Sequence, residues 1–315
     1  MENYVTKNMI IRKEPGGKLI WVLFIFAGII IGVILFKLTK KDMINPVIDS
    51  KAMTVEAIKI DRKKQIPAEE LKKRVSEEIN KAQGTYSVYY YDLLTGDNFG
   101  INEQMIMTAA SVTKIPILAS VYHLGGKGEL DLDKLIVPQA KDIQDYGTGT
   151  IRYDKPGTAY SIKTLARLMM EKSDNTAAYV LASIVVGINR VQEQVENWGL
   201  SQTDMKENKT SVKDMFIITR KIYNGEITTP ELTKEMIGFM DDSDFEDRIP
   251  RNLPDFVKVY HKTGDEVRIV HDAGIIDIPE RPYFLGIMTS DVPDSEETKA
   301  VMGRISQIVF SSITE

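Results

Sequence analysis

A serine and a lysine spaced three residues apart, at the start of an apolar stretch, constrain this chain more than any other feature. Ser111 and Lys114 occur in Ala-Ser-Val-Thr-Lys-Ile-Pro, residues 110–116. A separation of three places both side chains on one face of a helix. At a helix start the backbone N–H groups are unpaired and the dipole is positive, which suits a nucleophilic hydroxyl and an oxyanion. The sequence therefore predicts an activated serine here.

Two further motifs follow in a fixed order, Ser173-Asp174-Asn175 and Lys262-Thr263-Gly264. A single Ser-x-x-Lys occurs by chance in many chains, and each of the other two alone is compatible with a helix break or a strand end. Together the three motifs resemble the superfamily of class A β-lactamases and penicillin-binding proteins. The stretches SDNTAAYVLA and HDAGII support the resemblance, which extends over residues 67–315.

The resemblance implies a role for each motif residue. Ser111 would attack an amide carbonyl and become acylated, and Lys114 would take its proton as a neutral amine. Burial and the nearby cation of Lys262 would both lower the pKa of Lys114. Ser173 would pass a proton to the leaving nitrogen, and the backbone N–H groups of Ser111 and Asp265 would form the oxyanion hole. The substrate-binding residues would be Asn175, Lys262, Thr263, Gly264 and Asp265.

The chain departs from class A β-lactamases where a deacylating glutamate is expected. In those enzymes a Glu followed by Leu-Asn, between the second and third motifs, activates the water that releases the acyl group. Here residues 200–211 contain no Glu-x-x-Leu-Asn and form a shorter segment. Glu207 is the only glutamate in it. Glu207 is a candidate deacylation base. Its position is also compatible with an ordinary residue of the loop that precedes the helix capped by Ser211.

A second departure is Asp265, which directly follows the third motif. A carboxylate there would repel an anionic substrate unless it points away or is paired. Arg268 is close enough in sequence to pair with Asp265, or alternatively to bind the substrate carboxylate. The sequence leaves both alternatives open.

The periodicity predicts an α/β fold of the α+β kind. A helix after Pro67, a strand at 86–94 and a second short strand come first. A block of helices follows, including an apolar helix at 107–124, helices at 161–172, 176–186 and 189–198, and a helix capped by Ser211. Strands at 257–261, 267–278 and 283–289 and a helix at 295–312 end the chain. We therefore expect one antiparallel sheet shared by both ends and flanked by the terminal helices, with the middle of the chain forming a helical lobe.

Residues 19–36 contain no charged side chain, which is close to the length that crosses a bilayer. Lysines follow directly, without a small-residue cleavage pattern, so the sequence favours an uncleaved anchor over a signal peptide or a core helix. The predicted organisation is a cytoplasmic segment at 1–18, a transmembrane anchor at 19–38, a tether at 39–66 and a β-lactamase-like hydrolase domain at 67–315. The family's substrates lie outside the cytoplasm, so we expect a single-pass cell-membrane protein with an extracytoplasmic domain.

Composition narrows the function further. The chain has no cysteine, which excludes a catalytic thiol and a zinc–thiolate site. Its net charge is −5, with the basic excess confined to the first 41 residues, which argues against nucleic acid as a partner. The histidines His123, His261 and His271 have no metal-ligand spacing, so no metal or cofactor is predicted.

Three functions compete: a β-lactamase-type hydrolase, a penicillin-binding D,D-peptidase that releases β-lactams slowly, and a non-hydrolytic β-lactam sensor or scaffold. The complete set of serines and lysines argues against a scaffold. We predict a class A β-lactamase-like serine hydrolase that forms an acyl-enzyme at Ser111. Its substrate would be a β-lactam or the D-Ala-D-Ala-type amide of a peptidoglycan stem peptide.

Overall fold

The computed structural model describes residues 66–241 and 243–314. The predicted cytoplasmic segment, the anchor and all but the last residue of the tether lie outside this part of the chain, so these assignments stay predictions. Within residues 66–241 and 243–314, no helix combines the length and the apolar character needed to cross a membrane.

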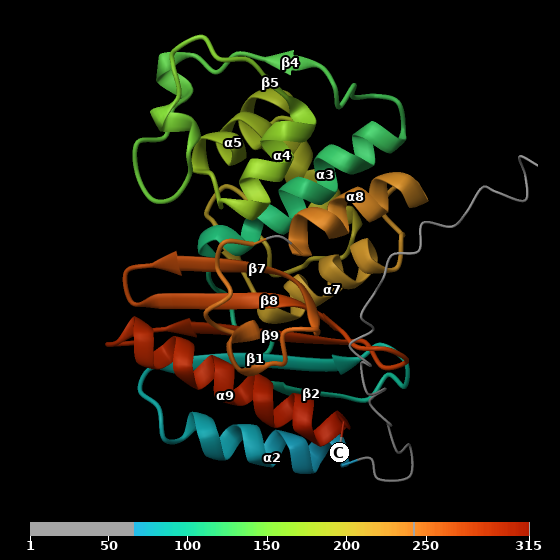
Figure 1. The fold of residues 1–315 in the computed structure, drawn as a ribbon, viewed down its shortest axis with the longest axis vertical. Coiled ribbons are helices and arrows are strands. Elements are labelled where there is room, and N and C mark those ends of the chain that lie inside the picture. The colour runs from blue at the N-terminus through green and yellow to red at the C-terminus, as the bar shows by residue number, and fades with distance from the viewer. Residues whose placement is uncertain (1–65, 242, 315) are drawn as a thin grey trace, which may run out of the picture. The chain divides into compact units, whose positions relative to one another are not determined.

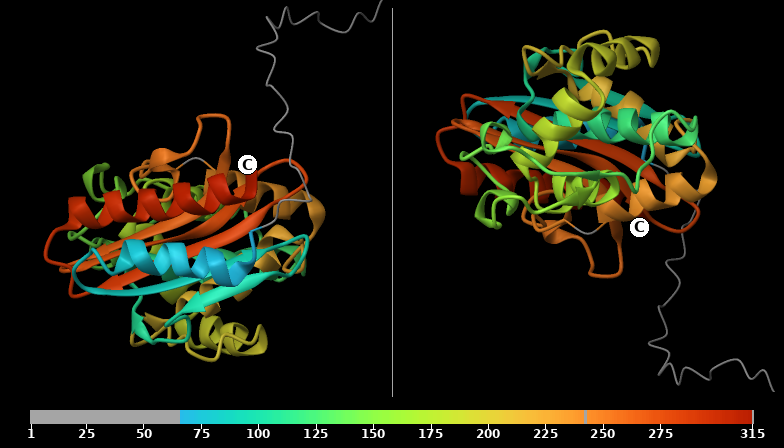
Figure 2. Two further views of the ribbon diagram at one scale, coloured as in Figure 1. Left: turned by 90° about the horizontal axis from the view of Figure 1, so that it is seen from below. Right: turned by 90° about the horizontal axis from the view of Figure 1, so that it is seen from above.

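A five-stranded antiparallel sheet joins the two ends of the described chain (Figure 1). Its strand order is β2-β1-β9-β8-β7. The strands are β1 (Thr85–Asp92), β2 (Asn98–Ile101), β7 (Lys258–Glu266), β8 (Ile269–Asp277) and β9 (Tyr283–Ser290). Helices α2 (Ala68–Ile79) and α9 (Ser295–Thr314) pack together on one face of this sheet (Figure 2). The predicted sharing of one sheet by both ends, with terminal helices on it, is confirmed.

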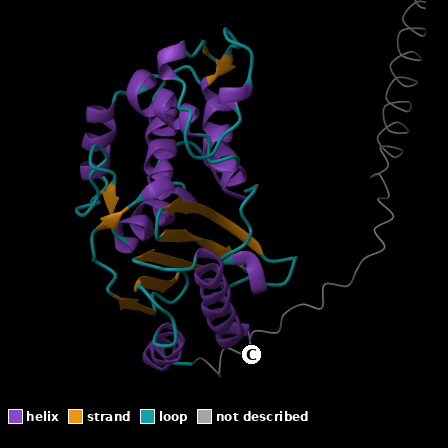
Figure 3. Cartoon of the chain, turned by 90° about the vertical axis from the view of Figure 1, so that its left-hand side faces the viewer, coloured by secondary structure: helices purple, strands orange, loops and turns teal. Residues whose placement is uncertain are grey.

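Burial along the strands explains why both faces must be covered. All but the last residue of β9 are buried, whereas β7 alternates between exposed and buried at its start. A strand that is buried on both sides needs a layer on each face of the sheet. Helices α2 and α9 provide one layer, and the helical lobe provides the other (Figure 3). Strand β7 lies at the sheet edge beside that lobe.

Helix α3 (Lys114–Gly126) occupies the centre of the helical lobe and is buried along most of its length. Around it lie α4 (Ile162–Glu171), α5 (Asn175–Tyr179), α6 (Ile188–Asn197), α7 (Val212–Tyr223) and α8 (Pro230–Asp241). The predicted cap at Ser211 is present, because its hydroxyl accepts a hydrogen bond from Asp214 N at 3.1 Å. Ser161 caps α4 in the same way through Thr164 N.

Two predicted helices start or continue differently in the structure. The predicted helix 107–124 begins as strand β3 (Met107–Thr108) and the 3-10 turn η2 (Ala110–Thr113), and the α-helix starts only at Lys114. The predicted helix 176–186 divides into α5 and a π-helical segment, η5 (Val180–Val185). β3 pairs with β6 (Lys209–Thr210), and this pairing holds the chain extended just before the turn.

The connection between α3 and α4 holds short elements. These are β4 (Leu135–Ile136), β5 (Tyr160–Ser161), and the 3-10 turns η3 (Ala140–Asp142) and η4 (Ile151–Tyr153). A further 3-10 turn, η6 (Pro250–Asn252), precedes β7.

Candidate active site

Ser111 lies in η2, the turn that connects β3 to the buried helix α3. The residue before it, Ala110, has a φ of 49°, a left-handed conformation that costs energy for a residue with a Cβ. Contacts on both sides hold this strained turn: Ala109 N donates to Asn208 O at 2.8 Å, and Thr113 Oγ1 donates to Asn208 Oδ1 at 3.1 Å. The turn therefore presents Ser111 in a fixed position.

Lys114 is the centre of the polar network around Ser111. Its Nζ lies 3.1 Å from Ser111 Oγ, 3.1 Å from Ser173 Oγ, 2.6 Å from Ser173 O and 2.8 Å from Asn175 Oδ1. The two shortest contacts are to oxygens that can only accept hydrogen bonds. A neutral amine can donate to both and keep its lone pair for a serine hydroxyl.

The surroundings of Lys114 favour this neutral amine. The side chain is buried, and burial is the main reason why its pKa falls well below the ordinary value for lysine. The cation of Lys262 lowers it further, whereas Asp174 opposes the shift. The lysine is thereby suited to accept the Ser111 proton, as the resemblance implied.

The second motif is bonded to a loop, residues 146–151, along its whole length. Asn175 N donates to Thr148 O at 3.2 Å, and Thr148 Oγ1 donates to Ser173 O at 2.8 Å. Asp174, which is buried, caps α5 and accepts hydrogen bonds from Thr150 N at 2.6 Å and Ile151 N at 2.9 Å. Ser173 itself has a φ of 50°. These bonds hold Ser173 and Asn175 against Lys114.

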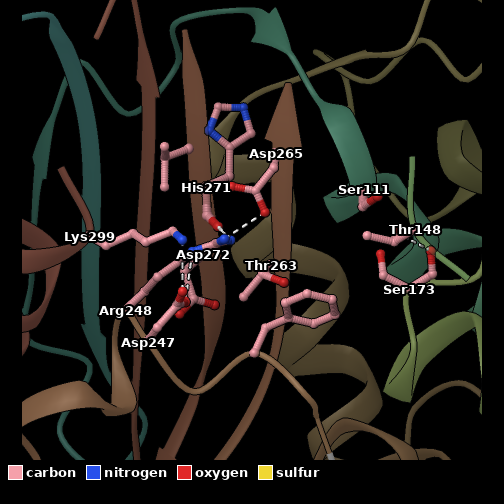
Figure 4. Close-up of polar contacts among 12 residues, drawn as sticks. Ser111, Thr148, Ser173, Asp247, Arg248, Thr263, Asp265, His271, Asp272 and Lys299 are labelled. Carbon is pink, nitrogen blue, oxygen red and sulfur yellow. Dashed lines mark hydrogen bonds and ion pairs between the residues drawn. The ribbon is translucent and has the colours of Figure 1, made fainter. Parts of the chain in front are cut away.

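The third motif lies on edge strand β7, opposite the nucleophile turn (Figure 4). Lys262 and Thr263 are buried, and Lys262 Nζ donates to Thr263 O at 3.0 Å. Gly264 packs closely against the nucleophile turn, since a Cβ there would lie 3.0 Å from Ser111 N and 3.2 Å from Ala109 O. The strand therefore passes directly beside the serine, and the backbone of Asp265 follows at the place where an oxyanion hole is expected.

Asp265 pairs with an arginine that sequence reasoning missed. Arg248 Nη2 lies 2.5 Å from Asp265 Oδ2, and Arg248 Nη1 donates to His271 O at 3.0 Å. Arg248 is 1% exposed, and it also contacts Asp247 (Figure 4). Arg268, in contrast, is exposed at the β7–β8 turn, where it donates to Asp291 O at 3.0 Å. The structure thus assigns the pairing role to Arg248 and places Arg268 on a different contact.

Two buried histidines, His271 and His261, lie in the sheet next to the site. His271 accepts a hydrogen bond from Thr289 N at Nδ1, so its Nε2 donates to Thr108 O at 2.8 Å, three residues before Ser111. Burial lowers the pKa of His271, in agreement with a neutral ring.

His261 lies between Asp272 and Glu246. Burial opposes its charge, but Asp272 and Glu246 outweigh it and raise its pKa to about 9. Among the described residues no cluster could hold a metal ion.

These elements enclose a cavity of about 150 Å³. It is lined by Ser111, Gly147, Thr148, Ser173, Asn175, Phe245, Thr263 and Asp265. Lys114 and Lys262 lie just behind this lining, whereas Glu207 does not contribute to it. Glu207 is exposed, and its backbone N–H donates to Asp204 in the 201–210 loop. That loop contacts the nucleophile turn through Asn208 instead.

A plot of kcat/KM against pH should have an alkaline limb. Burial and the neighbouring Arg248 lower the pKa of Lys262 to about 7. A lysine is cationic below its pKa, so its charge is lost as the pH rises through about 7. If this cation binds the substrate carboxylate, kcat/KM should fall above pH 7, by up to about tenfold per pH unit. Acylation rates from pH 5 to 9 test this, with the methyl ester of the same substrate as control. A limb of equal steepness for acid and ester would contradict it.

Comparison with known proteins places the chain in a family. A model of the β-lactamase enzyme family matches residues 70–313. A β-lactamase of Bacteroides uniformis is 22% identical over 272 residues, which is 78% of this chain and 91% of that protein. The extended-spectrum β-lactamase PER-1 of Pseudomonas aeruginosa is 24% identical over 226 residues, 64% of this chain and 73% of that protein.

Solved structures give the same result. The structure of PBP-A is 26% identical and superposes with a TM-score of 0.73, covering 79% of this chain and 97% of PBP-A. A mutant of PBP-A has been captured as an acyl-enzyme complex with penicillin G. A β-lactamase from Sphaerobacter thermophilus has the same fold, with 23% identity, a TM-score of 0.71, and coverage of 76% and 95%. The chain belongs to the β-lactamase enzyme family. It is a β-lactamase-like serine hydrolase.

Proposed function

We propose that this enzyme is a penicillin-binding D,D-peptidase, which cleaves the D-Ala-D-Ala amide of stem peptides and releases β-lactams slowly. The bond-breaking step would begin when Ser111 Oγ attacks the carbonyl carbon and its proton moves to Lys114 Nζ, 3.1 Å away. The tetrahedral oxyanion would be stabilised by the N–H groups of Ser111 and Asp265. The C–N bond then breaks, and the leaving nitrogen takes the proton from Lys114 through Ser173 Oγ, also 3.1 Å from Nζ.

The third motif would bind the end of the substrate. The carboxylate of a terminal D-alanine, or of a penicillin, would lie against Thr263 at the cavity wall, with the charge of Lys262 behind it. Asp265 opposes an anion at the same edge. Its pairing with the buried Arg248 neutralises that charge, so a carboxylated substrate can be accommodated.

The observation that carries the proposal is that the described cavity lining contains no free carboxylate. Asp265 is the only carboxylate among the described residues that line it, and that carboxylate is bound by Arg248. A water that attacks the ester on Ser111 needs a general base. After a peptide is cleaved, the free D-alanine leaves and Lys114 can activate the water that takes its place, whereas an opened β-lactam keeps its leaving nitrogen tethered beside Ser173 and Lys114. Without a glutamate in the lining, the β-lactam ester on Ser111 should persist. The likeness to PBP-A supports this proposal, since a mutant of that protein is known as a penicillin G acyl-enzyme.

A β-lactamase is the second candidate, and the relatives favour it. Two curated relatives, at 22% and 24% identity, are named β-lactamases. This candidate requires a base that reaches the acyl group, and Glu207 is the glutamate that the sequence offers. Its exposure, outside the cavity lining, argues against that role.

Release of D-alanine from diacetyl-L-lysyl-D-alanyl-D-alanine tests the proposed activity. We expect the full-length chain to release the terminal D-alanine, and the matched peptide ending in D-alanyl-L-alanine to be cleaved at least about tenfold more slowly. The Ser111→Ala variant gives the background rate. Cleavage no faster than this background, by a protein that is still acylated by penicillin, would reject the peptidase and leave only penicillin binding.

A further inference from the structure

A second cavity lies beside the 146–151 loop, whose last residue, Ile151, lines it. Its volume is about 430 Å³, within the usual range for sites that bind small molecules. Residues 137–143 and 151–160 form its walls, and the apolar part includes Val137, Pro138, Ile143, Ile151 and Pro156. None of its lining residues belongs to the lining of the Ser111 cavity. It is therefore a separate site.

Two cations and one carboxylate, Arg152, Lys155 and Asp154, line this cavity, which leaves it a net positive charge. Arg152 and Lys155 line it and form no ion pair with any described carboxylate, whereas Asp154 is bound by the Tyr160 hydroxyl at 2.5 Å. Arg152 Nε is buried and has no hydrogen-bond partner within the described residues, and the guanidinium stacks on Tyr153. A ligand in the cavity cannot reach that nitrogen, so what the cavity offers is the rest of the partly exposed Arg152 side chain and the exposed Lys155. A carboxylate binds a guanidinium well. The walls and the charge together fit a small apolar body that carries one carboxylate.

The wall of this cavity continues into the catalytic segment. Ile151, which is buried, lines the second cavity, while Gly147 and Thr148 of the same loop line the Ser111 cavity. The Asp174 carboxylate binds the backbone of Thr150 and Ile151, next to Ser173. A ligand that moves or fixes Ile151 therefore acts on the hydrogen bonds that position Ser173.

We propose that the second cavity binds a small amphipathic carboxylate and that its occupation changes the rate of Ser111 acylation. The carboxylate binds Arg152 and Lys155, and the apolar body contacts Val137, Ile143 and Ile151. The change in rate follows from the bonds between the 146–151 loop and the second motif. The binding part of this inference does not depend on the proposed peptidase function, because it concerns a different cavity.

The probe is phenylacetylglycine, an aromatic carboxylate without a β-lactam ring, titrated calorimetrically into the full-length chain. We expect saturable binding that weakens about tenfold or more in Arg152→Met, since a charge-assisted hydrogen bond is lost. Lys141→Met, which removes an exposed cation of the 137–143 wall that does not line the cavity, should stay within about twofold of the unchanged protein. The neutral analogue phenylacetylglycinamide should bind about tenfold more weakly. Thermal unfolding confirms that each variant is folded.

The kinetic arm measures penicillin acylation with and without saturating phenylacetylglycine. We expect a change of about twofold or more in the unchanged protein and none in Arg152→Met. Absence of binding would overturn the proposed site. Binding that survives in Arg152→Met but is lost in Thr263→Val would overturn it too, because Thr263 lines the Ser111 cavity. Binding to the Arg152 cavity with an unchanged acylation rate would overturn the coupling.

Discussion

Replacing Lys114 by methionine should slow the acylation of Ser111 by about 10²–10⁴-fold, the usual contribution of a positioned general base. The reason is geometric: Lys114 Nζ is within 3.1 Å of both Ser111 Oγ and Ser173 Oγ, and burial keeps its pKa low. Methionine fills a similar buried volume but can neither accept nor pass on a proton. The measurement is the second-order rate constant for labelling by a fluorescent penicillin.

Two further variants make this result interpretable. Ser111→Ala should give no covalent label at all, which sets the background. Lys163→Met removes a lysine of α4 that pairs with Glu235, away from the cavity, and should label at close to the normal rate. If Lys114→Met is folded by circular dichroism and labels within about threefold of the unchanged protein, Lys114 is not the base.

Local sequence signals predicted much of the fold because they act over short distances. The Ser211 cap depends on a hydroxyl three residues before Asp214 N, and the structure contains that bond. The strand at 283–289 was visible because nearly every residue in it is apolar, as a strand buried on both faces must be. The three motifs lie around one cavity as the resemblance implied.

Other parts of the site could not be predicted, because they depend on loop paths through space. Arg248 lies outside the three motifs, in the segment before η6, and it reaches Asp265 and His271 O because that segment packs against β7 and β8. Sequence proximity offered Arg268 either as the partner of Asp265 or as a substrate-binding residue, but the tight β7–β8 turn directs Arg268 to Asp291 instead. The 146–151 loop was also missed, because its contacts with the second motif are mostly made by backbone groups, which leave no side-chain signal.

The start of the catalytic helix shows how a motif can be found while its local structure is misjudged. The apolar run predicted one helix through Ser111, yet the serine lies in a 3-10 turn after a left-handed Ala110. Pairing of β3 with β6 and the contacts of Asn208 impose that geometry. Both are tertiary contacts, and they override the helical periodicity.

The lifetime of the penicillin G adduct tests most directly the central claim, that a cavity lined without a free carboxylate forms the acyl-enzyme but releases it slowly. Intact mass of the full-length chain is followed after mixing, beside Ser111→Ala and Glu207→Gln. We expect an adduct on Ser111 that persists for hours, far beyond a typical enzyme turnover of about 0.1 s. The lifetime should be unchanged in Glu207→Gln. If the adduct on the unchanged protein disappears within seconds while hydrolysed penicillin accumulates, the account is contradicted. If the adduct then persists in the Glu207→Gln variant, Glu207 is the base that activates the water.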